Sequence, residues 1–220
     1  MTYVTIGIFL LAGLVARIVY LLCLVRYRKT QLVARPQSRL KPAKTAIVMG
    51  SGGHTAEMLR LVGTLNFSNY NPRLYIMAST DKGSEAKVIN LENEGNLKRE
   101  SERYIIHRIP RSRHVNQSYI SSVFSTLYSL LYSVPFLLRE KPELILCNGP
   151  GTCVPICAIA FFMKILWICD CKIVFVESIC RVKTLSLTGK ILLHFADEFF
   201  VQWKDLHDLY RSTKYIGCLV

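Results

Sequence analysis

A glycine-rich turn between an apolar run and an amphipathic segment constrains the fold of this chain most. The apolar run covers residues 45–49, the turn reads Gly-Ser-Gly-Gly-His-Thr over residues 50–55, and apolar residues recur at helical spacing over residues 58–65. Strand, glycine-rich turn and helix predict the first unit of a doubly wound α/β domain. Such a turn brings backbone N–H groups of a helix start close to a ligand, which suits a phosphate. The same turn could also be a tight connection between strand and helix that binds no ligand.

The segments beyond this turn alternate between apolar strand signals and helical signals. Predicted strands cover residues 45–49, 73–78, 103–109, 143–147, 171–176 and 198–202. Residues 119–138 and 153–167 are predicted helices between strands, and residues 80–99 are a polar loop and helix. Apolar strands connected by helices indicate a parallel sheet covered on both faces. The predicted fold is therefore α/β, a Rossmann-like parallel sheet over residues 45–220.

The first 25 residues form a separate segment. Residues 3–25 are almost wholly apolar, with Arg17 as the only charged residue, and a membrane span needs ~20 apolar residues. Residues 26–44 contain seven Lys or Arg side chains and no acid, which favours the cytosolic side of a membrane. We predict a transmembrane signal anchor over residues 1–25, a basic linker over residues 26–44 and a cytosolic body. A glycan on Asn66 or Asn116, which lie in glycosylation sequons, would contradict this orientation.

The charge and cysteine content narrow the choice of partners. The chain has 28 Lys and Arg against 15 Asp and Glu, a net charge of +13, which favours an anionic membrane face or a phosphate-bearing substrate. No RNA-binding signature or zinc-finger spacing is present, so no nucleic-acid partner is expected. Most of the eight cysteines lie in apolar runs without paired CxxC spacing, which predicts reduced thiols and no metal site.

Four loops are expected to form a site, because ligands of open parallel sheets bind beyond the carboxyl ends of the strands. They follow the strands that end near residues 49, 109, 147 and 176. The residues predicted to bind an anion there are Gly50, Ser51, Gly52, Gly53, Arg111, Arg113, Asn148, Gly149, Gly151 and Thr152.

Two residues of these loops are candidates for catalysis. His54 could take a proton from a substrate hydroxyl, since an unperturbed histidine has a pKa of ~6.5. Alternatively, His54 is a residue at the helix start that orients the loop. Glu177 could be the base, or it could orient an arginine or a backbone amide.

Two further segments have alternative interpretations. The helix over residues 119–138 has a serine stripe surrounded by aromatic residues. It fits a crossover helix buried on the sheet, or a helix that also touches the bilayer surface. The chain ends in the apolar residues Tyr215, Ile216, Gly217, Cys218, Leu219 and Val220. This tail could dock a partner or pack back on its own sheet.

Four motifs, at residues 50–59, 109–113, 147–155 and 176–182, together resemble the Alg14 family over nearly the whole chain. That family is the membrane-anchored subunit of the UDP-N-acetylglucosamine (UDP-GlcNAc) transferase of dolichol-linked oligosaccharide synthesis. It is similar to the N-terminal, acceptor-binding half of GT-B glycosyltransferases of the MurG kind. The glycine-rich loop and histidine of those enzymes correspond to Gly50, Gly52, Gly53 and His54.

The resemblance implies a subunit in the N-glycosylation precursor pathway. The reaction would transfer the second GlcNAc from UDP-GlcNAc to GlcNAc-pyrophosphate-dolichol on the cytosolic face of the endoplasmic reticulum membrane. A cytosolic partner, Alg13, would bring the donor-binding half and would be recruited by this chain. No cofactor is implied. No second domain is expected after residue 220, so the chain is expected to be inactive alone.

Two alternative functions remain open. In the first, the chain is a membrane scaffold in which His54 and Glu177 do no chemistry. In the second, it is a membrane-bound NAD(P)-dependent oxidoreductase. The second is less well supported, because Thr55 occupies the position of the third glycine of the dinucleotide-binding fingerprint. In addition, the acid that binds the ribose should follow the fingerprint by ~20 residues, and Asp81 lies later than that.

Overall fold

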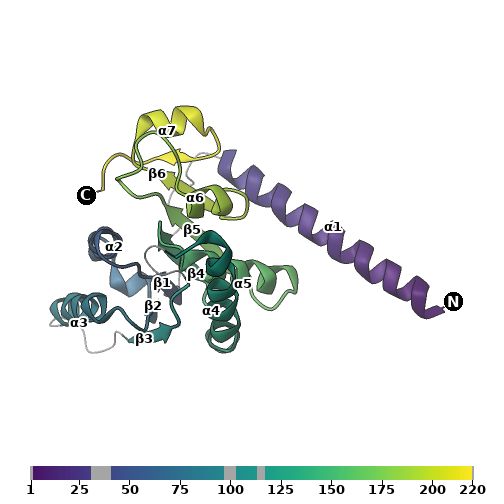
Figure 1. Cartoon of the computed structure of the whole chain (residues 1–220), viewed down its shortest axis with the longest axis horizontal. Coiled ribbons are helices and arrows are strands. Elements are labelled where there is room, and N and C mark those ends of the chain that lie inside the picture. Colours follow the sequence, from purple (N-terminus) through teal and green to yellow (C-terminus); the bar gives the residue numbers. More distant parts are fainter. Residues whose placement is uncertain (1, 31–40, 97–102, 113–116, 220) are drawn as a thin grey trace.

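The computed structural model describes residues 2–30, 41–96, 103–112 and 117–219. Its body is a single parallel sheet in the order β3-β2-β1-β4-β5-β6-β7 (Figure 1). The strands are β1 (Thr45–Val48), β2 (Arg73–Ala78), β3 (Tyr104–Ile109), β4 (Leu144–Asn148), β5 (Lys172–Val176), β6 (Glu198–Val201) and β7 (Lys214–Tyr215). The strand order reverses between β1 and β4, as in doubly wound folds. The α/β prediction is confirmed, and the six predicted strands are present.

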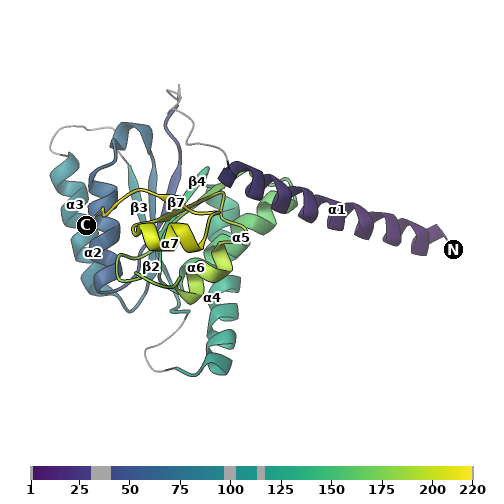
Figure 2. The same ribbon diagram turned by 90° about the horizontal axis from the view of Figure 1, so that it is seen from above.

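Helices cover both faces of this sheet (Figure 2). They are α2 (Gly53–Gly63), α3 (Lys82–Asn96), α4 (Tyr119–Glu140), α5 (Cys153–Ile165), α6 (Leu187–Leu192) and α7 (Lys204–Leu209). Alternate residues of β1 point to opposite faces and enter two cores. Ala46 and Val48 pack with α4 and α5, whereas Ile47 and Met49 pack with α2 and α3. The short elements α6, α7 and β7 were not predicted.

The N-terminal helix α1 (Thr2–Thr30) projects from the body (Figure 1). The segment Tyr3–Lys29 is long and apolar enough to cross a membrane, as predicted from composition. The helix continues through residues 26–30, which the sequence had assigned to the basic linker. Residues 31–40 of that linker lie outside the described part of the chain. Helix α4 also satisfies the length and composition of a span, and Pro135 lies inside it.

The C-terminal tail packs along the edge of its own sheet. Lys214 and Tyr215 pair with β6, and the backbone N–H of Ile216 donates to the carbonyl of Val201 at 3.2 Å. The N–H of Leu219 then donates to Oε1 of Gln202 at 3.0 Å. The backbone of the tail thus packs on its own sheet, while the side chains of Tyr215, Ile216 and Leu219 stay exposed. Val220 lies outside the described residues.

Candidate functional site

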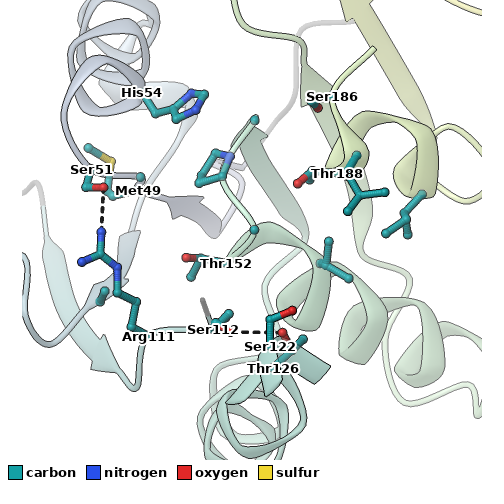
Figure 3. A pocket seen from close by; sticks show the side chains of 18 of the residues that line it. Met49, Ser51, His54, Arg111, Ser112, Ser122, Thr126, Thr152, Ser186 and Thr188 are labelled. Atoms are coloured by element: carbon teal, nitrogen blue, oxygen red, sulfur yellow. Dashed lines mark hydrogen bonds between the residues drawn. The ribbon is translucent and has the colours of Figure 1, made fainter. Parts of the chain in front are cut away.

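A cavity of about 790 Å³ lies beyond the carboxyl ends of β1 and β4, where the strand order reverses (Figure 3). The turns after β1, β3 and β4 form one side of it, and α4 and α6 form the other. Six residues predicted to bind an anion line it: Gly50, Ser51, Arg111, Gly149, Gly151 and Thr152. His54 also lines it. The sheet topology therefore brings all four predicted loops to the cavity, the loop after β5 through Arg181 alone.

Two of the three glycines after β1 are required for different reasons. Gly52 has φ 63°, a left-handed conformation that favours glycine, and α2 begins at Gly53. Gly50 is required by packing, since a Cβ there would lie 2.6 Å from Cβ of His54. The hydroxyl of Thr55 donates to the Gly50 carbonyl at 2.7 Å and holds the turn against the helix. Gly52 and Gly53 shape the turn and are not among the residues lining the cavity.

His54 lies in the first turn of α2 and points to the cavity (Figure 3). Its ring packs against Gly149, where an added Cβ would lie 2.5 Å from the ring atom Cε1. Burial lowers the pKa of His54, the nearby Glu57 carboxylate opposes this effect, and Arg181 adds to it. Among the described residues, its buried Nδ1 has no hydrogen-bond partner and lies 3.9 Å from Oε2 of Glu57. A neutral imidazole at pH 7 can accept a proton.

Glu57 joins the two glycine-rich turns, a role that sequence reasoning missed. Its Oε1 accepts a hydrogen bond from the hydroxyl of Ser178 at 2.7 Å. Its Oε2 accepts one from Nδ2 of Asn148 at 3.3 Å, and the same Nδ2 donates to the His54 carbonyl at 3.0 Å. The spacing of His54 and Glu57 could have indicated that they lie together, because residues three apart share one face of a helix. Asn148 therefore supports the turns from behind the cavity.

Glu177 does not reach the cavity. Its carboxylate is fully buried and accepts hydrogen bonds from the backbone N–H groups of Ser178 and Ser186, at 3.2 and 2.9 Å. The hydroxyl of Ser186 donates to the same carboxylate at 3.1 Å and accepts from the N–H of Gly189, so it caps α6. Burial raises the pKa of Glu177 despite these hydrogen bonds. The geometry fits the alternative in which Glu177 orients backbone amides and does not act as base.

Two arginines provide positive charge at the cavity. Arg111 donates from Nη2 to the hydroxyl of Ser51 at 3.0 Å, which connects the turn after β3 to the turn after β1 (Figure 3). Arg181 also lines the cavity and was not predicted as a site residue. Arg113 lies outside the described residues. Together with the N-terminus of α2, these side chains make one end of the cavity suitable for an anion.

The other side of the cavity is mainly apolar, with the hydroxyls of Ser122, Thr126 and Thr188 among the apolar side chains, and sequence reasoning also missed this surface. Its residues come from α4, α5 and α6: Val123, Leu127, Leu130, Val154, Leu187 and Ile191. An amphiphile with a phosphate group and a hydrocarbon chain matches both sides. Within the part of the chain that the structure describes, no group of three or more His, Cys, Asp or Glu side chains could hold a metal ion.

The fold is of the GT-B type. The crystal structure of Acinetobacter baumannii MurG matches this chain with a TM-score of 0.53 at 14% sequence identity. The match covers 74% of this chain and 42% of that chain, and at this identity it supports the fold alone. It confirms the Rossmann-like, GT-B-type architecture expected from the sequence.

Sequence comparison then identifies the family. Residues 45–219 match the family model "Oligosaccharide biosynthesis protein Alg14 like". A Rattus norvegicus relative is 54% identical over 177 residues, covering 79% of this chain and 82% of the relative. A Homo sapiens relative is 51% identical with the same coverage, and a Candida albicans relative is 42% identical over 188 residues, 86% of this chain and 83% of the relative. Each is named a UDP-N-acetylglucosamine transferase subunit ALG14. The chain belongs to the Alg14 family.

Proposed function

We propose that this chain is the membrane-anchoring, acceptor-binding subunit of a UDP-GlcNAc transferase. Its substrate would be GlcNAc-pyrophosphate-dolichol, to which the complex adds the second GlcNAc in the N-glycosylation precursor pathway. A separate Alg13-type subunit would bind UDP-GlcNAc. The names of the relatives support the transferase reaction, and the word subunit supports a partner.

The observation that carries the acceptor role is the two-sided cavity. A lipid pyrophosphate requires cations and backbone N–H groups at its head, and an apolar surface along its chain. The cavity offers Arg111, Arg181 and the start of α2 at one end, and apolar side chains of α4 and α6 at the other. The exposed apolar side chains of α4, including Val123 and Leu127, extend this surface toward a bilayer.

His54 is the proposed base for the acceptor. Glycosyl transfer needs a group that takes the proton of the attacking sugar hydroxyl, and it needs stabilisation of the departing nucleotide. His54 lines the cavity with a pKa lowered by burial, so it is neutral and able to accept that proton. The departing UDP would be held by the partner subunit.

The proposed location is the endoplasmic reticulum membrane, with a single span and a cytosolic body. Helix α1 supplies the candidate span, and its last turn carries Arg28 and Lys29. Basic residues next to a span favour its cytosolic side.

A reconstituted transfer assay tests the proposal. UDP-GlcNAc and a lipid-pyrophosphate-GlcNAc acceptor are supplied to this chain alone, to the Alg13-type subunit alone and to both. We expect turnover only with both, and we expect this chain alone to bind the acceptor. A lipid with the same chain but no pyrophosphate is the control. Absence of acceptor binding by this chain and by the complex would contradict the acceptor role, and full turnover by the partner alone would reduce this chain to a scaffold.

The tail is the proposed docking element for the partner. Deleting residues 216–220 should release the partner from membranes while this chain stays bound, because the exposed apolar side chains of Ile216 and Leu219 would be lost. Continued co-purification of the two subunits would contradict this docking site.

A further inference from the structure

Helix α1 consists of two halves with different surroundings. Every side chain of residues 3–16 is exposed, as expected for a segment that contacts lipid. From Arg17 onward one face packs on the body, and Leu21, Val25 and Lys29 are buried on it. These three residues recur at every fourth position, which places them on one stripe of the helix. The second half of α1 is therefore attached to the body.

Three contacts made by two arginines fix this attachment. We call it the α1–α5 joint, and it consists of Arg17, Leu21 and Arg28 of α1, with Lys164, Trp167 and Asp197 of the body. The guanidinium of Arg17 lies 4.3 Å from the ring centroid of Trp167 and donates from Nη2 to the Lys164 carbonyl at 3.3 Å. Three turns further on, Nη1 of Arg28 contacts Oδ1 of Asp197 at 2.9 Å.

The body side of the joint is connected by buried polar contacts. Oδ2 of Asp197 accepts from Nζ of Lys164 at 2.7 Å and from the backbone N–H of Ile173 at 2.9 Å. The side chains of Asp197 and Lys164 are both almost fully buried. One carboxylate thus connects α1, the last turn of α5 and strand β5. The depth of α1 in a membrane consequently sets the position of the end of α5.

The length of the apolar surface of α1 determines that depth. The outward face stays apolar through Cys23, and exposed cations begin at Arg26. At ~1.5 Å per residue, residues 3–23 extend about 30 Å, which equals the hydrocarbon thickness of a bilayer, ~30 Å. Residues 3–16 alone would extend only about 21 Å. A full span therefore draws the first turns of the joint, with Arg17, into the leaflet on the side of the body.

The end of α5 has the composition for that environment. Phe162, Leu166 and Trp167 are 61%, 56% and 71% exposed, although all three are large and apolar. Tryptophan settles at the boundary between lipid and water, and an arginine against its ring is partly shielded from the apolar layer. Figures 1 and 2 show α5 lying between α1 and α4.

We infer that the end of α5, with Phe162, Leu166 and Trp167, inserts into the leaflet beside α1, and that the α1–α5 joint holds the body in one orientation on the membrane. The occupant of this apolar surface is the bilayer interface. Helix α4, which contacts α5, is thereby brought next to the same leaflet. The inference rests on the proposed membrane span of α1.

Tryptophan fluorescence tests the insertion directly. The chain has two tryptophans, so a Trp203→Phe variant of the full chain reports Trp167 alone. It is reconstituted in phosphatidylcholine–phosphatidylserine vesicles with nitroxide lipids labelled near the acyl carbonyl, and iodide is the aqueous quencher. We expect strong quenching of Trp167 by the nitroxide and weak quenching by iodide. Trp203, reported by a Trp167→Phe variant, should show several-fold weaker nitroxide quenching.

An Arg17→Leu variant tests the joint, because it keeps α1 apolar while removing the contacts to Trp167 and the Lys164 carbonyl. Nitroxide quenching of Trp167 should weaken, whereas Arg60→Leu, which removes an exposed cation from α2, should leave it unchanged. Unchanged quenching in Arg17→Leu would overturn the role of the joint. Strong quenching of Trp167 by iodide, in a chain that stays in the vesicles after alkaline carbonate extraction, would overturn the insertion and leave the proposed span intact. Release of the chain by carbonate would contradict the proposed span, and with it this inference.

Discussion

The two glycine-rich turns beside the strand reversal look alike in sequence and do different work. Gly52 in the first turn and Gly149 in the second both have left-handed φ angles, 63° and 61°. A Cβ on Gly52 would meet nothing within 4 Å, whereas a Cβ on Gly149 would collide with the ring of His54. The first turn therefore presents a helix start and a histidine to the cavity, and the second provides the surface on which that histidine rests.

The comparison shows that a glycine in such a turn can make room for a neighbouring side chain as well as for a ligand. Asn148 strengthens the arrangement, since its amide donates both to the carbonyl of His54 and to Glu57. The second turn acts mainly by positioning His54, although Gly151 and Thr152 also line the cavity. Four substitutions test this division of roles.

His54→Ala should have the largest effect. If the first turn carries the base, kcat of the reconstituted complex should fall by roughly 10²–10⁴-fold, with little change in the KM for UDP-GlcNAc. His194→Ala, at an exposed histidine, is the matched control. Full turnover of His54→Ala would assign the chain to the scaffold alternative.

Gly149→Ala should have the second largest effect on the rate. The new methyl group would displace the His54 ring, and alanine is strained at the left-handed φ of this position. A displacement of ~1 Å at a reacting group can lower the rate about 10²-fold. Gly151→Ala is the matched control, since its Cβ would meet nothing within 4 Å and its φ is not left-handed. Steady-state kinetics distinguish the two. Equal effects of both variants would mean that the second turn contacts the substrate and does not position His54.

Arg111→Gln should weaken acceptor binding. Loss of a charge-assisted hydrogen bond, worth ~1.5–3 kcal/mol, should raise the KM for the lipid acceptor by about tenfold or more. Arg108 carries the same charge nearby but is held by Glu85 on the surface, so Arg108→Gln should change little. A KM that responds equally to both substitutions would indicate general attraction to an anionic membrane.

Glu57→Gln should have the smallest effect on rate and a distinct effect on pH dependence. The carboxylate of Glu57 raises the pKa of His54, opposing burial and Arg181, which lower it. Its removal should therefore move the acid limb of the kcat/KM profile to lower pH, with kcat near neutrality reduced a few-fold. Glu85→Gln is the control. An acid limb that stays in place or moves to higher pH would show that Glu57 does not influence the catalytic group.

Much of the fold could be predicted because its signals are local. Apolar strands and the two glycine-rich turns are each encoded within a few consecutive residues, and the six longer strands were recognised from them. The elements α6, α7 and β7 are too short to show a period. Helix α6 begins at the local cap of Ser186, whose hydroxyl is also held by the Glu177 carboxylate. Strand β7 forms because it pairs with β6, from which it is separated by α7.

The sequence by itself determined the doubly wound architecture, the apolar N-terminal helix, the glycine-rich turns and the histidine that follows the first turn. Only the tertiary structure decided which polar residues face the cavity. Glu177 and Glu57 both belong to recognisable motifs, yet Glu177 is enclosed by Ser178 and Ser186, whereas Glu57 lies beside His54. The physical reason is that a carboxylate's role depends on the donors around it, and the sheet brings those donors from segments far apart in the chain.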